Sequence, residues 1–136
     1  MSEHNSVPSL EPGLQAEVEI TVSEAETASQ LGSGTIAVYA TPALIALMES
    51  AAVRALEGHL PPGQTTVGGR IDVRHLVATP VGMQVRTQAE LIEIQGRKLS
   101  FHIQAWDEVE QIGEADHIRF IVDESSFMER ARKKRK

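Results

Sequence analysis

The sequence predicts an α+β fold in which one antiparallel β-sheet wraps around a single long helix. One observation is an apolar segment with helix start signals over residues 41–57. A second is a series of strand patterns at 14–22, 64–77, 83–94, 98–108 and 111–123, most of them joined by short turns. A meander of this kind presents one apolar face, and packing the helix on that face buries both surfaces.

The helix over 41–57 is expected to begin with Thr41 as its N-cap, to carry Pro42 in its first turn and to end before Gly58. Its residues are apolar on almost every side, which is typical of a buried helix. Glu49 is the one charge in the middle of this segment. Because a buried carboxylate is costly unless it is paired or neutralised, Glu49 is the first candidate for function. A structural acid at a solvated edge is the alternative.

The other elements follow from local patterns. Residues 1–13 are polar and contain two prolines, which predicts a flexible arm. Residues 14–22 alternate apolar and polar side chains, as a half-buried strand does. Ser23 and Glu26 have capping-box spacing and predict a short helical turn over 23–30. Two later strands form a hairpin around Gly96, and residues 124–136 are expected to be a polar tail.

Charge and composition exclude several classes of protein. The chain has 136 residues, no cysteine and a net charge of −6, which suits one soluble domain without disulfides or thiolate metal sites. Residues 130–136 hold six of the thirteen basic residues, so the remainder has seven basic against nineteen acidic residues, a net charge of −12. An acidic body argues against nucleic-acid binding. The sequence contains no membrane-spanning run or signal-peptide pattern, and we expect a cytoplasmic protein.

The strand over 64–77 carries the second candidate. By simple alternation, His75 shares a face with Ile71 and Gly69. That apolar face should meet the helix that carries Glu49, so we expect His75 and Glu49 to converge as an acid–base pair. A histidine that is only part of the core remains the alternative. The adjacent Gly68 and Gly69 indicate either a bulge or a close approach to a ligand.

Thr41 and Glu49 lie eight residues apart, about 12 Å along a straight helix. This leaves space for a small acyl group or a water, and the free amides at the helix start suit a developing oxyanion. Thr41 could equally be only a helix cap. No His-x-His or His-x-x-x-His spacing occurs, so we expect no metal site.

Several motifs together resemble the fluoroacetyl-CoA thioesterase group of the hotdog superfamily. They are Thr41 with Leu47-Met48-Glu49, Gly68 with Val73-Arg74-His75, Thr79-Pro80-Val81-Gly82, Gly96-Arg97-Lys98-Leu99-Ser100, and Ile112-Gly113 with His117-Ile118-Arg119. The resemblance covers about residues 10–125. It implies a hotdog fold over residues 14–125, between the arm at 1–13 and a basic tail at 126–136. It also implies a homodimer with its sites at the subunit interface.

The resemblance further implies hydrolysis of a short-chain acyl-CoA, with CoA as part of the substrate and no separate cofactor. It implies Thr41, Glu49 and His75 as the catalytic set and a substrate contact by Gly68, Gly69 and Arg119. The phenylalanine gate of the fluoroacetyl enzymes is absent from residues 31–39, so we expect a different or broader acyl preference. Two alternatives remain, a non-catalytic acyl-CoA-binding hotdog protein and an enoyl- or hydroxyacyl-CoA hydratase with His75 as base.

Overall fold

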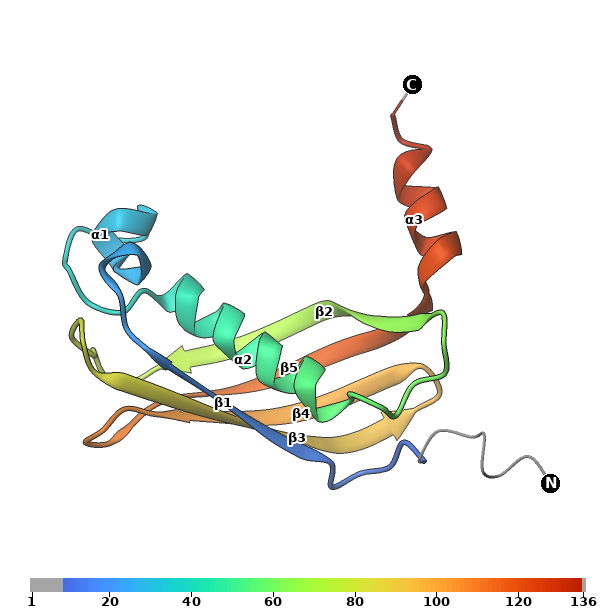
Figure 1. Ribbon diagram of the computed structural model, residues 1–136, viewed down its shortest axis with the longest axis horizontal. Helices are drawn as coiled ribbons and strands as arrows, with labels where there is room; N and C mark the ends of the chain where they lie inside the picture. Colours follow the sequence, from blue (N-terminus) through green and yellow to red (C-terminus); the bar gives the residue numbers. More distant parts are fainter. Residues whose placement is uncertain (1–8, 136) are drawn as a thin grey trace.

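The computed structural model describes residues 9–135. In chain order the elements are β1 (Gln15–Thr21), the 3₁₀ turn η2 (Glu24–Glu26), α1 (Ala28–Leu31), α2 (Thr41–Ala55), β2 (Gln64–His75), β3 (Gln84–Gln95), β4 (Lys98–Trp106), β5 (Gln111–Asp123) and α3 (Glu124–Arg132). The five strands form one antiparallel sheet that curves around α2 (Figure 1). This confirms the predicted α+β architecture.

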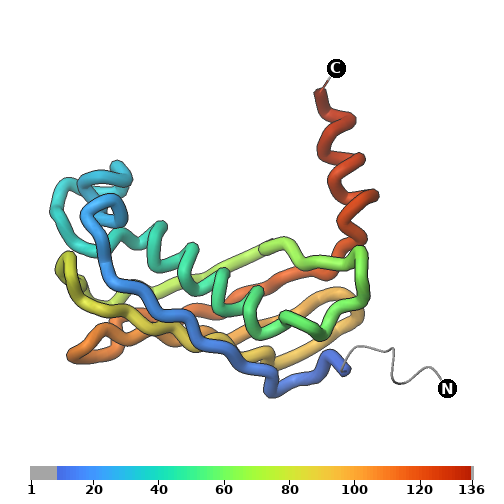
Figure 2. Tube along the Cα trace, in the orientation of Figure 1, coloured from blue at the N-terminus to red at the C-terminus, as the bar shows by residue number. Residues whose placement is uncertain are grey.

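The strand order is β1-β3-β4-β5-β2, with every neighbouring pair antiparallel. The predicted hairpin joins β3 to β4, and Gly96 in its turn has a φ of +62°, a value that favours glycine. β1 and β2 are the two edge strands, which Figure 2 shows on opposite sides of the curved sheet. Within the described residues, the outer edge of β2 is therefore unpaired.

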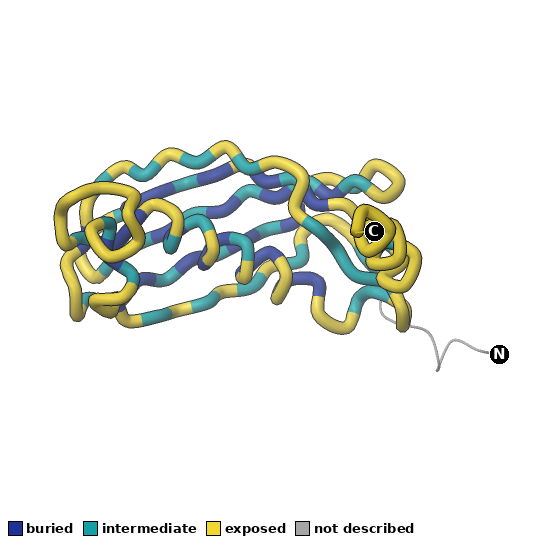
Figure 3. Tube along the Cα trace, turned by 90° about the horizontal axis from the view of Figure 1, so that it is seen from above, coloured by how far each residue is buried: buried dark blue, intermediate teal, exposed yellow. Residues whose placement is uncertain are grey.

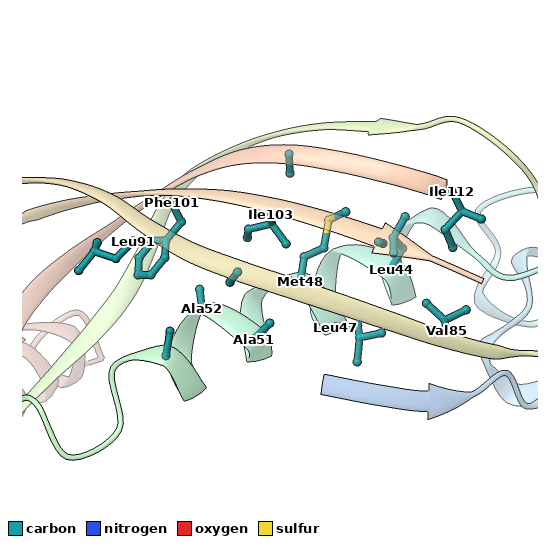
Figure 4. Close-up of a cluster of buried hydrophobic side chains, with 14 of the residues drawn as sticks. Leu44, Leu47, Met48, Ala51, Ala52, Val85, Leu91, Phe101, Ile103 and Ile112 are labelled. Atoms are coloured by element: carbon teal, nitrogen blue, oxygen red, sulfur yellow. The ribbon is translucent and has the colours of Figure 1, made fainter. Parts of the chain in front are cut away.

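The core lies between α2 and the concave face of the sheet (Figure 4). From α2 come six buried residues: Leu44, Leu47, Met48, Ala51, Ala52 and Ala55. From the strands come Val85, Leu91, Leu99, Phe101, Ile103 and Ile112, among others. The alanines have little bulk, so the helix can lie close to the strands. Full burial of a side chain as large as Leu44 stabilises the fold by about 1.5–3 kcal/mol.

The prediction that α2 is buried on all sides is wrong for the single protomer. Pro42, Ala46 and Val53 are exposed, while Ile45 and Glu49 between them are half-buried. These residues recur every three or four positions and therefore form one stripe along the helix. In Figure 3 the colour of the α2 tube changes between buried, intermediate and exposed within its turns. An exposed apolar stripe interrupted by one carboxylate is the surface that a protein partner would cover.

The ends of α2 also differ from the prediction. Ala40 is the N-cap, and Thr41 is the first helical residue. The hydroxyl of Thr41 makes no cap hydrogen bond; it bonds a side chain from β2 instead. The helix ends at Ala55 with Leu56 as its C-cap, and Gly58 turns the chain two residues later, with a φ of +80°.

The helical turn predicted after the first strand is confirmed. Ser23 and Glu26 form the capping box at the start of η2, and α1 follows. Residues 1–8 of the predicted arm, and Lys136, lie outside the described residues. Within the described part of the arm, Leu10 packs against the core and the Gly13 amide donates to the Leu91 carbonyl at 2.8 Å.

The predicted polar tail contains α3, which extends away from the body beyond β5 (Figure 1). None of its residues is buried. Glu124 near its start and Arg130 and Arg132 near its end complement the helix dipole, which stabilises an otherwise isolated helix. Within residues 9–135, no helix is long and apolar enough to cross a membrane.

Candidate active site

One half of the candidate site lies where α2 begins beside the end of β2. Thr41 is the first residue of α2 and His75 is the last residue of β2. The Thr41 Oγ1 lies 2.7 Å from His75 Nδ1, a hydrogen-bond distance. The free amides and the positive dipole end of α2 are therefore close to an imidazole that is held in place. We call Thr41 and His75 the histidine half-site.

The imidazole of His75 is uncharged at neutral pH. Burial lowers its pKa below the usual 6.5, and the nearby backbone of Val77 opposes part of that shift. The Nε2 atom of His75 is buried and has no hydrogen-bond partner among the described residues. Leaving such an atom unpaired is costly. Nε2 is therefore the polar atom of this half-site for which the described chain supplies no hydrogen bond.

The two adjacent glycines of β2 form a β-bulge. The register of β2 against β5 shifts between Gly68 and Arg70, so Gly69 is the extra residue. The faces predicted for Gly68 and Gly69 from simple alternation are therefore wrong. Gly68 faces α2, whereas Gly69 faces the ring of Phe120 on the outer side of the sheet. Of the two interpretations of the glycines, the bulge is present, and Gly68 also allows a close approach.

That close approach is by the carboxylate of Glu49. A Cβ placed on Gly68 would lie only 2.8 Å from Glu49 Oε2, which real Cβ atoms do not tolerate. Arg119 Nη1 lies 3.6 Å from the same oxygen, and His117 Nε2 lies 4.0 Å from it. We call Glu49, Gly68, His117 and Arg119 the acid half-site. A pocket of about 240 Å³ is lined by Glu49, Gly68 and His117 of this half-site, together with Gly69, Arg70 and Ile71.

Two buried side chains, the Arg119 guanidinium and the His117 imidazole, lie beside the half-exposed carboxylate of Glu49. The Glu49 side chain is 41% exposed, whereas those of Arg119 and His117 are 8% and 1% exposed. Arg119 is fixed by Thr66, whose hydroxyl accepts from Nε at 2.9 Å and whose carbonyl accepts from Nη2 at 3.0 Å. A carboxylate beside this buried guanidinium is held close to a fixed positive charge.

The two half-sites do not meet within one protomer. Glu49 lies against Gly68, and Thr41 bonds His75, yet Gly68 and His75 are separated by seven positions of β2, roughly 20 Å of extended strand. No contact joins Glu49 to His75 in the described chain, and each half-site lines its own pocket. The predicted convergence therefore does not occur inside the protomer.

The pocket at the histidine half-site has a volume of about 270 Å³. Beyond Thr41 and His75, its lining is small or aliphatic: Ala28, Ser33, Val38, Leu76, Val77 and Ala78, with Tyr39 as the one aromatic residue. Tyr39 is buried and donates its hydroxyl to the Ala43 carbonyl at 3.3 Å, so its ring is part of the wall. The loop over 32–37 beside this pocket is exposed throughout.

Sequence reasoning missed His117 of the acid half-site and Thr66, which supports Arg119. His117 lies two positions before Arg119 and therefore on the same face of the strand. This shared face was the signal in the sequence that could have identified His117. Thr66 carries no signal of its own, because its contact with Arg119 depends on the pairing of β2 with β5. Within residues 9–135, no group of three or more His, Asp or Glu side chains is placed to hold a metal.

Comparison with known proteins agrees with this architecture. The model of the family described as FlK, fluoroacetyl-CoA-specific thioesterase, matches residues 22–125. The fluoroacetyl-CoA thioesterase of Streptantibioticus cattleyicolor is 40% identical over 97 residues, which cover 71% of this chain and 70% of that enzyme. The residues matched by the family model include Glu49, His75 and Arg119.

Solved structures give the same result. That of the fluoroacetyl-CoA thioesterase FlK superposes with a TM-score of 0.89 at 32% identity, covering 95% of this chain and all of that one. A variant of FlK solved with fluoroacetate and CoA has a TM-score of 0.82 at 33% identity, over 87% of this chain and 99% of that one. A hot-dog-like protein from Thermanaerovibrio acidaminovorans has a TM-score of 0.84 at 20% identity, over 92% and 93% of the two chains, and supports the hotdog fold.

Proposed function

This chain belongs to the fluoroacetyl-CoA-specific thioesterase family of hotdog proteins, and we propose that it hydrolyses a short-chain acyl-CoA to the free acid and CoA. As a member of that family it is a thioester hydrolase. The proposal assigns Thr41, Glu49 and His75 to catalysis, and Gly68 and Arg119 to the substrate. Gly69 contributes through its backbone, since its missing side chain faces the outer surface.

The observation that carries the proposal is the placement of the two half-sites along β2. On the edge strand β2, the midpoint between Gly68 and His75 falls between Ile71 and Asp72. If two copies of β2 pair antiparallel around that midpoint, Gly68 of one protomer lies opposite His75 of its partner. The acid half-site of each protomer then meets the histidine half-site of the other, and a homodimer has two complete sites.

The exposed stripe of α2 supports the same dimer. Pro42, Ala46 and Val53 are apolar and exposed in the single protomer, and Glu49 lies between them. Covering this stripe with the partner's α2 removes the apolar surface from water. The same contact desolvates Glu49, which strengthens its interaction with Arg119 and with the substrate.

In the composite site the two half-sites have distinct roles. The Glu49 carboxylate either attacks the thioester carbonyl, giving a mixed anhydride and CoA thiolate, or activates a water that attacks the same carbon. His75, bonded to Thr41, accepts the proton released by the attacking water and passes it to the CoA thiolate; if an anhydride forms first, this water is the one that cleaves it. The first-turn amides of α2 stabilise the oxyanion. Arg119 holds a positive charge beside Glu49 throughout.

The pocket lining favours a broader set of acyl groups than fluoroacetyl. Ala28, Ser33 and Ala78 present little bulk, and no phenylalanine lines the pocket. A pocket with small walls admits additional methylene groups, each of which adds about 0.8 kcal/mol of burial. We therefore propose acetyl- to butyryl-CoA as the substrate range.

A panel of acyl-CoA esters with thiol detection tests the function. Release of free CoA thiol from acetyl-, propionyl- and butyryl-CoA is expected, with loss of turnover in Glu49→Ala. Equal turnover by Glu49→Ala and the natural protein would remove the proposed role of Glu49. Tight binding of the esters without thiol release would indicate a sensor. An absorbance change with crotonyl-CoA and no thiol release would indicate a hydratase.

A further inference from the structure

A buried histidine with no role in the proposed reaction lies at the centre of the acid half-site. His117 is 1% exposed and its ring centroid lies 6.2 Å from that of Phe101. It is far from the Thr41–His75 contact, since it lies beside Gly68. The imidazole is therefore a polar group inside the core, and such a group is retained only where its hydrogen bonds are satisfied.

The hydrogen bonds of His117 fix its tautomer. Nδ1 lies 2.7 Å from the Arg70 carbonyl oxygen, which can only accept, so Nδ1 carries a proton. Nε2 lies 3.2 Å from Arg119 Nη1, and a guanidinium can only donate, so Nε2 is unprotonated. Burial and the charge of Arg119 lower the pKa of His117, while the Arg70 carbonyl and Glu49 oppose them. Both lines of evidence agree on a neutral imidazole.

The contact between His117 Nε2 and Arg119 Nη1 also affects how Arg119 interacts with Glu49. Thr66 accepts from Nε and Nη2 of the guanidinium, and His117 accepts from Nη1. Glu49 Oε2 remains 3.6 Å from Nη1, longer than the 2.7–2.9 Å of a charge-assisted hydrogen bond. These supports take three of the five N–H donors of the guanidinium, one of them on Nη1. The carboxylate lies beside a positive charge without being bound in a close ion pair.

We propose that His117 is a positioning residue, whose unprotonated Nε2 holds the Arg119 guanidinium in place so that the Glu49 carboxylate stays free to react. This inference rests on the proposed function, because it names the device that keeps the acid of that site available. The charged groups that face His117 are Glu49 from α2 and Arg119 from β5; Arg70 of β2 presents its carbonyl, and Phe101 of β4 an uncharged ring. Without the Nε2 acceptor, Nη1 turns to Glu49 and pairs with it directly.

Two substitutions separate the two hydrogen bonds of His117. The side-chain amide of asparagine reaches the Nδ1 position and keeps the bond to the Arg70 carbonyl, but it offers no acceptor to Arg119. The longer glutamine places an oxygen near the Nε2 position and keeps an acceptor for Arg119. We expect His117→Asn to lower kcat about 10- to 100-fold with KM nearly unchanged. We expect His117→Gln to retain kcat within about threefold.

A matched control is His102→Asn. His102 lies on the outer side of the neighbouring strand β4, where its Nδ1 lies 3.2 Å from Asp116 Oδ1. Asparagine can again occupy the Nδ1 position, so the control makes the same substitution far from the site. We expect its kinetics to equal those of the natural protein. Equal kinetic losses in His117→Asn and His117→Gln, or no loss in either, would overturn the positioning role. Circular dichroism and thermal unfolding establish that each variant is folded.

The protonation state of His117 can also be measured in the natural protein, so this test does not require any variant to fold. Nitrogen-15 NMR of the imidazole should show His117 neutral, with the proton on Nδ1, at pH 7. A charged ring, or a proton on Nε2, would overturn the inference. If the protein hydrolyses no acyl-CoA, the proposed function fails by itself, and this spectrum still decides whether His117 supports Arg119 as described.

Discussion

Replacing Gly68 with alanine is the smallest change that should displace Glu49. The new Cβ would lie 2.8 Å from Glu49 Oε2, 3.4 Å from His117 Cε1 and 3.5 Å from Arg119 Nη1. Ordinary contact begins near 3.4 Å, so the carboxylate must move by about 0.6 Å, while the other two atoms can stay. Gly68 has no positive φ, so the backbone accepts alanine without strain.

The size of the effect follows from that displacement. A misplacement near 1 Å in an active site costs roughly 100-fold in rate, so a shift of about 0.6 Å predicts a loss of about 10- to 100-fold in kcat/KM. In free energy this is about 1.4–2.8 kcal/mol of transition-state stabilisation. The unfolding free energy should change by less than about 1 kcal/mol, because the displaced group is the end of a half-exposed side chain.

Steady-state thiol release with acetyl-CoA, together with urea unfolding, measures both quantities. Gly69→Ala is the matched control, since its Cβ meets the ring of Phe120 on the outer face of the same bulge. We expect it to keep kcat/KM within about threefold, with any cost appearing in stability. If Gly69→Ala loses as much activity as Gly68→Ala, or if Gly68→Ala is fully active, the placement of Glu49 against Gly68 is wrong.

Three further predictions concern other parts of the protein. Thr41→Val removes the hydroxyl that bonds His75 Nδ1 and should lower kcat about 10- to 100-fold, whereas Thr41→Ser should restore most of it; equal rates for both variants would contradict the contact. The pKa values of His75 and His117 are lowered in the folded protein, so below pH 6.5 the unfolded chain binds more protons than the folded chain. Stability against urea should therefore be highest above pH 6.5 and should fall as the pH drops below it; equal stability above and below pH 6.5 would refute this. Leu44→Ala empties a fully buried position between α2 and the sheet and should lower the unfolding free energy by about 2–5 kcal/mol, measured by denaturant titration; a loss below 1 kcal/mol would contradict the described core.

Most of the fold could be predicted from local pattern. The strand over 111–123 has the same limits in the structure, and the Ser23–Glu26 capping box is present, because both depend on neighbouring residues. The face of Gly68 and Gly69 could not be predicted. Their alternation is set by pairing with β5, and a single extra residue in the bulge exchanges the two sides.

The site was predictable as a set of residue types but not as a geometry. Glu49 stood out because it is the one charge in an apolar helix, and His75 because it lies on an apolar strand face. The support of Glu49 by Arg119, Thr66 and His117 depends on three elements that meet only in the folded chain. Thr41 was expected to cap α2. Its hydroxyl instead bonds His75, since Ala40 occupies the N-cap position.

The central claim is that Glu49 of one protomer acts with His75 of its partner, and mixing two inactive variants tests it most directly. Glu49→Ala and His75→Ala homodimers each have two broken sites. In a mixed dimer, one composite site contains both substitutions and the other contains neither. After the two variants are unfolded together and refolded at equal amounts, half of the dimers are mixed, and about a quarter of the natural activity should return. If the mixture is as inactive as its components while size exclusion shows mixed dimers, Glu49 and His75 do not share a site across the interface.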